Sequence, residues 1–331
     1  MPSDTSAKPG TLPRVLLTSA IHPHWHDQLA GQAEVVLAPD STPATLTHLV
    51  REAEGLIVRN PLPPDIFAHA PRLRAVVRHG VGLDMIPVEA ATARGIPVAN
   101  LPGANTSAVV EYVLAAMLHL RRGLVPMDAA LRQQGWASAR ARADQAGELA
   151  GNVCGIVGLG AIGSRLATVV QGLGMRVLGL TRRAHSLPAG VVSADRATLF
   201  AQADVVVLCC PLNDQTRGLV SAELLATMQP HACLINVARG PVADAEAIVR
   251  ALRARRLGGA ALDVHAQQPL TGHEAVFDCP NLLLTPHVAG VTAPSMRGMS
   301  QQAVQTLLAL LRGEQPGNVV NPQVFAVSPR T

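Results

Sequence analysis

Lysine and tyrosine are almost missing from this chain of 331 residues, since Lys8 is the only lysine and Tyr112 the only tyrosine. Lys8 lies in a polar, proline-containing leader, residues 1–13. The chain therefore offers no buried lysine for a Schiff base or for a phosphate-binding loop. Dehydrogenases that use a tyrosine and lysine pair as their acid are excluded for the same reason.

Long apolar runs, paired cysteines and clustered charge are also missing. The most apolar stretch, 107–120, contains Glu111 and is shorter than the roughly 18 uncharged residues of a spanning helix. The five cysteines are odd in number without metal-like spacing, and the leader lacks the pattern of a secretory signal. The 27 basic and 23 acidic residues are scattered. We therefore expect a cytoplasmic protein with no membrane span and no nucleic-acid partner.

The residues that are present predict two α/β domains. A length of 331 residues with 48% hydrophobic side chains fits about two domains of roughly 150 residues. Short β-branched or leucine-rich runs alternate with helix-length segments, which favours parallel sheets covered by helices. The expected strands are 14–18, 34–37, 55–59 and 73–78 in a first series, then 153–157, 176–180, 205–209, 232–236, 260–264 and 282–285 in a second.

Two further segments link these series. An alanine- and leucine-rich stretch, 106–122, follows Pro102-Gly103 and predicts a long helix that joins the two α/β units. The end of the chain, from about 292 through a helix at 301–311, has no strand series of its own. We expect it to return and pack on the first domain.

A glycine-rich turn follows the first strand of the second series. Gly158, Gly160 and Gly163, with Ala161 and Ile162 between them, stand between an apolar strand and a segment of helical periodicity. In this context the first glycine permits the tight turn, the second lets the backbone approach a pyrophosphate, and the third lets helix and strand pack closely. The turn predicts a dinucleotide site.

The end of the next strand indicates which dinucleotide binds. An NAD site normally places Asp or Glu there, about 20 residues on, to bind the ribose 2′-hydroxyl. This chain instead has Thr181, Arg182 and Arg183. A carboxylate would repel a 2′-phosphate, whereas arginine binds it bidentately. The prediction is NADP, with NAD as the alternative if the two arginines are only surface residues.

A series of motifs runs along the chain in this order: Arg78-His79-Gly80-Val81-Gly82-Leu83-Asp84, the dinucleotide turn, Asn236-Val237-Ala238-Arg239-Gly240, Leu262-Asp263-Val264 with Pro269-Leu270, and Thr285-Pro286-His287 with Gly290. With these motifs, nearly the whole chain after the leader resembles the D-isomer-specific 2-hydroxyacid dehydrogenases, a family that includes phosphoglycerate dehydrogenases and glyoxylate/hydroxypyruvate reductases.

The resemblance implies a fold of two doubly wound parallel-sheet domains. A flavodoxin-like substrate domain would comprise 1–101 and 292–331, and an inserted Rossmann dinucleotide-binding domain would comprise 102–291, with the active site in the cleft. Position along the strands agrees, because Arg239, Asp263 and His287 fall at carboxyl ends of predicted parallel strands, where ligands bind in such sheets. Family members are typically dimers, and the apolar residues of 106–122 could face both the core and a partner.

The family pattern assigns the chemistry to three residues. Histidine exchanges protons near neutral pH, so His287 is the candidate acid/base for a 2-keto acid carbonyl. Arg239 would polarise the carbonyl and bind the substrate carboxylate. Gln268 stands where the family normally has a glutamate bonded to the histidine. An amide orients the ring but stabilises the imidazolium less than a carboxylate does, so we expect weaker reduction at neutral pH than in a glutamate-bearing relative.

The resemblance also supplies the remaining site residues. The main-chain NH groups of Val81 and Gly82 would hold the substrate carboxylate, and Arg59 and Arg78 would add positive charge for a larger anionic substrate. Asp263 would contact the nicotinamide amide. Further cofactor contacts are expected from four residues at strand ends and loops: Pro211, Thr216, Val237 and Gly290.

The expected function is reduction of a small 2-keto acid with NADPH, with glyoxylate or hydroxypyruvate as the first choice. The alternatives are a dehydrogenase for another anionic 2-hydroxy acid and a dinucleotide-sensing protein without turnover, which Gln268 keeps open. The alternating His22, His24 and His26 have a spacing that suits a metal, but we interpret them as a surface loop because no cysteine or carboxylate cluster completes a site.

Overall fold

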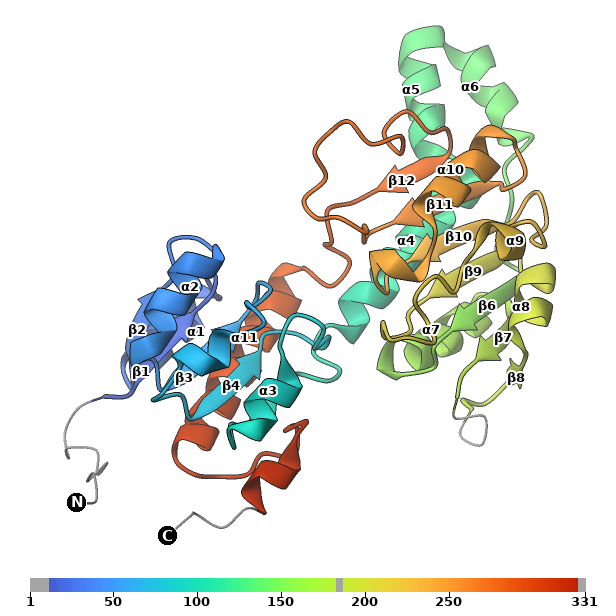
Figure 1. Cartoon of the computed structure of the whole chain (residues 1–331). Helices are drawn as coiled ribbons and strands as arrows, with labels where there is room; N and C mark the ends of the chain where they lie inside the picture. The colour runs from blue at the N-terminus through green and yellow to red at the C-terminus, as the bar shows by residue number, and fades with distance from the viewer. Residues whose placement is uncertain (1–11, 183–186, 327–331) are drawn as a thin grey trace, which may run out of the picture. The chain divides into compact units, whose positions relative to one another are not determined.

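The computed structural model describes residues 12–182 and 187–326 (Figure 1). The chain forms two compact units, with unit 1 comprising 1–104 and 292–331, and unit 2 comprising 105–291. The chain thus crosses between the units after Ala104 and after Val291. The sequence placed these crossings after residues 101 and 291.

Unit 1 contains a five-stranded sheet in which every pairing is parallel. Its strands are β1 (Arg14–Leu17), β2 (Glu34–Leu37), β3 (Gly55–Val58), β4 (Ala75–Arg78) and β5 (Val98–Ala99), in the order β2-β1-β3-β4-β5. This is the flavodoxin-like strand order that the sequence led us to expect. β5 escaped prediction because two residues are too few to show a pattern.

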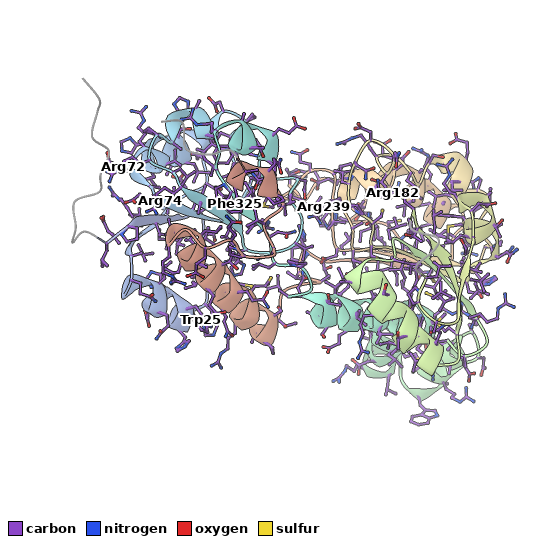
Figure 2. All side chains as sticks on the ribbon, turned by 90° about the horizontal axis from the view of Figure 1, so that it is seen from below. Trp25, Arg72, Arg74, Arg182, Arg239 and Phe325 are labelled. Atoms are coloured by element: carbon purple, nitrogen blue, oxygen red, sulfur yellow. The ribbon has the colours of Figure 1, made fainter. Side chains whose placement is uncertain are left out.

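The helices of unit 1 cover both faces of this sheet. They are α1 (Pro23–Ala30), α2 (Pro43–Leu49), α3 (Val88–Ala93) and α11 (Ala293–Leu311), with the short 3₁₀ turns η1 (Val50–Glu52), η2 (Ile66–His69) and η5 (Pro322–Phe325). The expected return of the chain end is confirmed, since α11 packs on β3, β4 and α1, with Trp25 beside it (Figure 2).

The first turn of α1 corrects one interpretation of the sequence. His24 and His26 lie in the helix, and His22 stands at its N-terminal boundary rather than in a loop. Pro23 begins the helix because a proline at the first helical position loses no hydrogen bond. Within the described residues, no three His, Cys, Asp or Glu side chains gather as they would around a metal ion.

Unit 2 contains a seven-stranded sheet whose pairings are also all parallel. Its strands are β6 (Val153–Val157), β7 (Arg176–Leu180), β8 (Val191–Ser193), β9 (Val205–Leu208), β10 (Cys233–Asn236), β11 (Gly259–Leu262) and β12 (Leu282–Leu284). The order is β12-β11-β10-β9-β6-β7-β8. The strands β7 and β8 lie on one side of β6, and the strands from β9 onward lie on its other side. The switch point of this Rossmann sheet is therefore between β6 and β9.

The helices of unit 2 pack against this sheet with one exception. α4 (Thr106–Arg122), which has the predicted bounds, packs with α7 (Ala161–Gly172) in one buried core, and α8 (Arg196–Gln202), α9 (Ala222–Leu225) and α10 (Ala245–Arg253) belong to a second. A 3₁₀ turn, η4 (Gly240–Val242), follows β10. The exception is the pair α5 (Leu124–Gln134) and α6 (Trp136–Ala143), which pack on each other and extend away from the sheet (Figure 1).

In the described part of the chain, none of the helices combines the length and the apolar character that crossing a bilayer requires.

Candidate active site

The glycine turn between β6 and α7 has the shape that a bound dinucleotide requires. Gly158 has φ of +98°, and a Cβ there would lie 2.7 Å from Cα of Cys210. A Cβ on Gly163 would lie 2.0 Å from the carbonyl oxygen of Gly158, so only glycine lets α7 pack against the turn. A Cβ on Gly160 would meet no atom within 4 Å. The open space at Gly160 is therefore a place where a pyrophosphate can approach the backbone.

The N-terminus of α7 adds donors to this turn. Gly160 occupies the N-cap position without a side-chain cap, and the first turn holds no acidic residue. The NH groups that follow, from Ala161 to Gly163, are the ones that an α-helix leaves without an intrahelical partner. Together with the positive end of the helix dipole they suit the negative charge of a pyrophosphate. The residues present therefore fit a dinucleotide.

The end of β7 presents an arginine and no carboxylate. Thr181 and Arg182 follow the strand directly, and Arg182 is exposed on unit 2 (Figure 2). Arg183, the second predicted phosphate ligand, lies outside the described residues.

Three adjacent strands bring the predicted catalytic residues to one edge of the sheet. β10, β11 and β12 are neighbours, and Arg239, Asp263 and His287 each follow the carboxyl end of one of them. Parallel strands end at the same edge, which is where open α/β sheets bind ligands. Their order along the chain is therefore also their order across the sheet.

The ring of His287 is held by Gln268. Nδ1 of His287 lies 3.1 Å from Oε1 of Gln268, whose Nε2 donates to the carbonyl oxygen of His265 at 3.3 Å. Because the amide nitrogen is engaged with a carbonyl, the amide oxygen faces the ring, so Nδ1 must be the donor. The proton on Nδ1 leaves Nε2 as the atom that gains and loses a proton. Both side chains are exposed and reachable by a ligand.

Asp263 holds the backbone of His287 and of the two residues that follow it. Its carboxylate is 1% exposed and accepts hydrogen bonds from the NH groups of Val288 at 2.7 Å and Ala289 at 2.8 Å. The NH of His287 donates to the carbonyl oxygen of Asp263 at 2.8 Å. These bonds hold His287 at φ of +58°, a left-handed conformation that non-glycine residues rarely adopt. The expected contact of Asp263 with nicotinamide stays a prediction.

Arg239 emerges from a loop that two buried features shape. The side chain of Asn236, 1% exposed, accepts from the NH of Ala238 and donates to the carbonyl oxygen of Arg239. A Cβ on Gly240 would lie 2.1 Å from the carbonyl carbon of His265, so the loop lies directly on the segment that leads to Gln268. Arg239 itself is half-buried, and its Nη1 donates to the carbonyl oxygen of Ala238 at 2.7 Å.

The remaining predicted cofactor residues occupy loops at the same edge. Pro211 lies in the loop after β9, where Oγ1 of Thr216 donates to its carbonyl oxygen at 2.7 Å. Val237 follows β10 and bonds to the backbone of Leu208. Gly290 packs so closely on Asn105 that a Cβ would lie 2.5 Å from its amide nitrogen. The contact of these residues with a cofactor stays a prediction.

A cavity of about 390 Å³ lies behind these loops. It is lined by Asn236 and Gly240, by residues of α10, and by His265 and Leu270. Arg239, Gln268 and His287 do not line this cavity.

In unit 1, Arg78 builds the loop that carries Val81 and Gly82. Its guanidinium donates to the carbonyl oxygens of Val58 at 3.0 Å, His79 at 2.8 Å and Gly82 at 3.2 Å. These bonds fold the backbone after β4 around one side chain. The main-chain atoms of Val81 and Gly82 are thereby fixed by Arg78.

Arg59 follows β3 in the same unit and is half-buried. It donates to the carbonyl oxygen of Ala20 and lies 3.9 Å from the sulfur of Met296. Burial lowers its pKa from the ordinary value. Its backbone NH is fixed by the hydroxyl of Thr18.

His79 is the buried polar centre of unit 1. It is 4% exposed, and its Nε2 lies 2.8 Å from the hydroxyl of Ser300 on α11. Burial, together with the positive charges of Arg59 and Arg78, lowers the pKa of His79 to about 3. The ring is therefore neutral at physiological pH and joins β4 to the chain end without carrying charge.

The cysteines of unit 2 belong to its core. Burial raises the pKa of the thiols of Cys154, Cys209 and Cys210, and Sγ of Cys209 donates to the carbonyl oxygen of Gly158 at 3.0 Å. A thiol with a raised pKa is a poor nucleophile. These residues support the glycine turn by packing.

Several supporting residues were not assigned a role from the sequence. Tyr112, Thr285 and His265 bond to the loops around His287, and Asn236 shapes the loop of Arg239. Most of them stand inside or beside the motifs already recognised. For Tyr112 the one signal in the sequence is that it is the only tyrosine of the chain.

Comparison with known proteins finds a family model and full-length relatives that match this chain. Residues 114–289 match the model of the D-isomer specific 2-hydroxyacid dehydrogenase, NAD binding domain. The chain is 32% identical over 326 residues to a glyoxylate reductase of Korarchaeum cryptofilum, covering 96% of this chain and 98% of that protein.

Solved structures give the same result. A protein of Thermus thermophilus superimposes with a TM-score of 0.83 at 33% identity, covering 93% of this chain and 99% of the other. An NADPH-dependent glyoxylate/hydroxypyruvate reductase of Sinorhizobium meliloti, in complex with NADP and malonate, superimposes with a TM-score of 0.84 at 29% identity, covering 94% and 98%.

Proposed function

The chain belongs to the D-isomer-specific 2-hydroxyacid dehydrogenase family of oxidoreductases, and from this premise we propose that it reduces glyoxylate or hydroxypyruvate with NADPH. The observation that carries the proposal is the pairing of His287 with Gln268 at the sheet edge that also presents Arg239. A glyoxylate reductase at 32% identity and a glyoxylate/hydroxypyruvate reductase of the same fold support this choice of substrate. The same residues run the reverse oxidation of a D-2-hydroxy acid.

The chemistry divides between the cofactor and the chain. The hydride that adds to or leaves the substrate carbon would be supplied or accepted by a nicotinamide cofactor held at the glycine turn. Nε2 of His287 gives a proton to the carbonyl oxygen in reduction and takes one from the hydroxyl in oxidation. Arg239 stabilises the negative charge that develops on that oxygen and binds the carboxylate, as its permanent charge and planar donors allow. In unit 1, the NH groups of Val81 and Gly82 bind the substrate carboxylate.

These roles assign a purpose to each unit. Unit 2 is the dinucleotide-binding domain, and unit 1 is the substrate domain. The glycine turn holds the pyrophosphate, with Ala161 and Ile162 at the helix start, while Pro211, Thr216, Val237, Asp263 and Gly290 contribute to the cofactor site. Arg59, held against Ala20, supplies positive charge for the substrate.

NADP is the proposed cofactor. The absence of a carboxylate at the end of β7 and the exposed guanidinium of Arg182 support it. A 2′-phosphate would receive bidentate hydrogen bonds from an arginine and no repulsion. An Arg182→Ala variant should raise KM for NADPH by about tenfold and leave KM for NADH unchanged, because a charged hydrogen bond contributes about 1.5–3 kcal/mol.

Assembly and location complete the proposal. The apolar residues Val109, Val110, Val113 and Met117 of α4 are buried within unit 2. The exposed apolar side chains lie further on, at Leu118 and along the α5–α6 pair, where Trp136 is 77% exposed. We propose a homodimer that covers this surface. The five free cysteines fit the reducing conditions of the cytoplasm.

The test is absorbance at the nicotinamide band while the purified protein meets NADPH or NADH with a panel of 2-keto acids, glyoxylate and hydroxypyruvate first. Faster turnover with NADPH is the expected result. Preference for NADH would overturn the cofactor assignment and keep the reaction. Turnover only with a larger anionic acid would reassign the substrate. Cofactor binding without turnover in either direction would favour a dinucleotide sensor instead.

A further inference from the structure

The only tyrosine of the chain lies on a line of hydrogen bonds that leads to His287. The hydroxyl of Tyr112, on α4, is 2.7 Å from Oγ1 of Thr285, and that oxygen is 2.7 Å from Oδ1 of Asp263. Tyr112 is half-buried, and burial raises its pKa, so the phenol keeps its proton at neutral pH.

The direction of these bonds follows from the atoms involved. An ionised carboxylate only accepts, so the hydroxyl of Thr285 donates its single proton to Asp263. Oγ1 of Thr285 then has only lone pairs left for Tyr112, so the phenol must be the donor. Tyr112 thus fixes the rotation of Thr285, and Thr285 satisfies one position on a carboxylate that is 1% exposed.

The far end of this line is the backbone of the catalytic loop. The other bonds to the Asp263 carboxylate come from the NH groups of Val288 and Ala289, the two residues that directly follow the left-handed His287. The ring of His265 donates from Nε2 to the carbonyl oxygen of Thr285 at 3.0 Å, and the carbonyl oxygen of His265 accepts from Gln268. Thr285 is therefore connected to His287 by two routes. One leads through the Asp263 carboxylate to the backbone after His287, and the other leads through His265 and Gln268 to the His287 ring.

We propose that Tyr112 is a positioning residue for His287 and acts through Thr285 and Asp263. This inference rests on the proposed acid/base role of His287. A left-handed residue stays in place only while its surroundings hold it. Without the phenol, the hydroxyl of Thr285 is free to rotate away from Asp263, which weakens the hold of the carboxylate on the loop and disorders the ring.

The expected signature is a loss of rate without a loss of binding. Tyr112→Phe removes one oxygen atom and keeps the packing of the ring. Misplaced reacting groups slow chemistry strongly, so kcat should fall by about tenfold while KM for the keto acid stays within about twofold. Hydrogen exchange at the amides of Val288 and Ala289 should quicken, because their acceptor is less firmly held.

Two further variants separate positioning from stability. Thr285→Val removes the middle of the line at constant volume and should reproduce both effects, and the double variant should be no worse than Thr285→Val alone, because residues of one network are not additive. Leu120→Ala, also on α4 and packed on the same core, is the matched control. It should lower the melting temperature and leave kcat and the exchange of Val288 unchanged.

The exchange measurement needs no substrate, so it stands even if glyoxylate reduction fails as the activity. Faster exchange at Val288 and Ala289 in both hydroxyl variants, together with the selective fall in kcat, supports the inference. Unchanged exchange in Tyr112→Phe overturns it. So does an additive double variant, or a Tyr112→Phe variant that behaves like Leu120→Ala, because the tyrosine would then only stabilise the fold.

Discussion

The two units share one architecture and differ in what they offer a ligand. Each is a parallel sheet covered by helices on both faces, and in each the loops after the strands are held by buried or half-buried polar groups. In unit 2 those groups are Asn236 and Asp263, and the loops they hold carry the side chains of Arg239 and His287. In unit 1 the holding group is Arg78, and the loop it holds offers main-chain atoms at Val81 and Gly82.

This difference follows from whether the charged side chain that holds the loop accepts or donates hydrogen bonds. Asp263 is an acceptor, so its carboxylate takes up the backbone NH groups that follow His287 and holds the loop that carries this side chain. Arg78 is a donor, so it takes up backbone carbonyl oxygens, and the NH groups of Val81 and Gly82 in its loop are the ones proposed to bind the substrate carboxylate. In our proposal the same strand-and-helix pattern therefore serves proton transfer by a side chain in unit 2 and anion binding by the main chain in unit 1.

Removal of Arg239 should lower activity more than any other change considered, because unit 2 is proposed to act through side chains. Arg239→Ala is expected to lower kcat/KM for glyoxylate by about a thousandfold, the cost of removing a group that stabilises developing negative charge. Steady-state kinetics measure this effect. Arg239→Lys keeps the charge without the planar donors and should recover only part of the rate; recovery of full activity would contradict the bidentate role.

Removal of Arg78 should affect binding instead of chemistry, because unit 1 is proposed to act through its main chain. In Arg78→Met the carbonyl oxygens of Val58, His79 and Gly82 lose their donor. KM for the keto acid should rise about tenfold with kcat nearly constant, since a disordered loop weakens binding by about 1–3 kcal/mol.

The control for this variant is Arg72→Met, which removes an exposed side chain of unit 1 (Figure 2). Arg72 forms ion pairs with Glu52 at 3.7 Å and with Glu54 at 3.8 Å. Arg72→Met should leave both constants unchanged. A fall in kcat with constant KM in Arg78→Met would show that the loop of unit 1 takes part in the chemical step.

Exchange of Gln268 for glutamate tests how the partner of the His287 ring affects proton transfer in unit 2. A carboxylate 3.1 Å from Nδ1 would stabilise the imidazolium of His287 and raise its pKa. Reduction needs the protonated ring, so Gln268→Glu should extend reductive activity to alkaline pH by about one unit, equivalent to about 1.4 kcal/mol. The pH profile of kcat/KM measures the shift. An unchanged profile would mean that this contact does not tune the acid.

His79 has the smallest expected effect on the reaction and concerns the stability of unit 1. Its pKa is about 3 in the folded chain and about 6.5 when unfolded, so the unfolded state binds an extra proton between these values. Stability therefore falls as the pH drops from about 6.5 toward 3, by at most about 1.4 kcal/mol per pH unit.

A His79→Gln variant should lose part of that acid dependence, as measured by denaturant unfolding at several pH values. His48→Gln, an exposed change on α2, serves as the control and should keep it. Identical slopes in the wild type and His79→Gln would show that His79 does not contribute to acid sensitivity.

Elements with strong local signals were predictable from the sequence. Continuous apolar runs gave the bounds of β6 and β7, and the Ala- and Leu-rich periodicity of α4 gave its limits. Short or polar elements were not predicted, because β5 has two residues and the α5–α6 pair packs mainly on itself. The histidines of α1 were taken for a loop because their alternation looks unlike a helix face.

For the site, motifs indicated residue identity but not the supporting contacts. The departure at Gln268 was visible in the sequence, and its contact with His287 required the folded chain. Tyr112 and Thr285 are separated by 173 positions, and no local pattern connects them.

The sequence by itself determined the alternation of strands and helices, the glycine turn, the lack of an acid at the end of β7 and the kinds of side chain that end β10, β11 and β12. These properties depend on residue type and near neighbours, which a linear chain records. Only the tertiary structure decided which polar atoms hold which loops: Arg78 on carbonyl oxygens, Asp263 on NH groups, and Tyr112 on Thr285. Such bonds join distant segments and depend on direction and distance, which exist only once the sheets have formed.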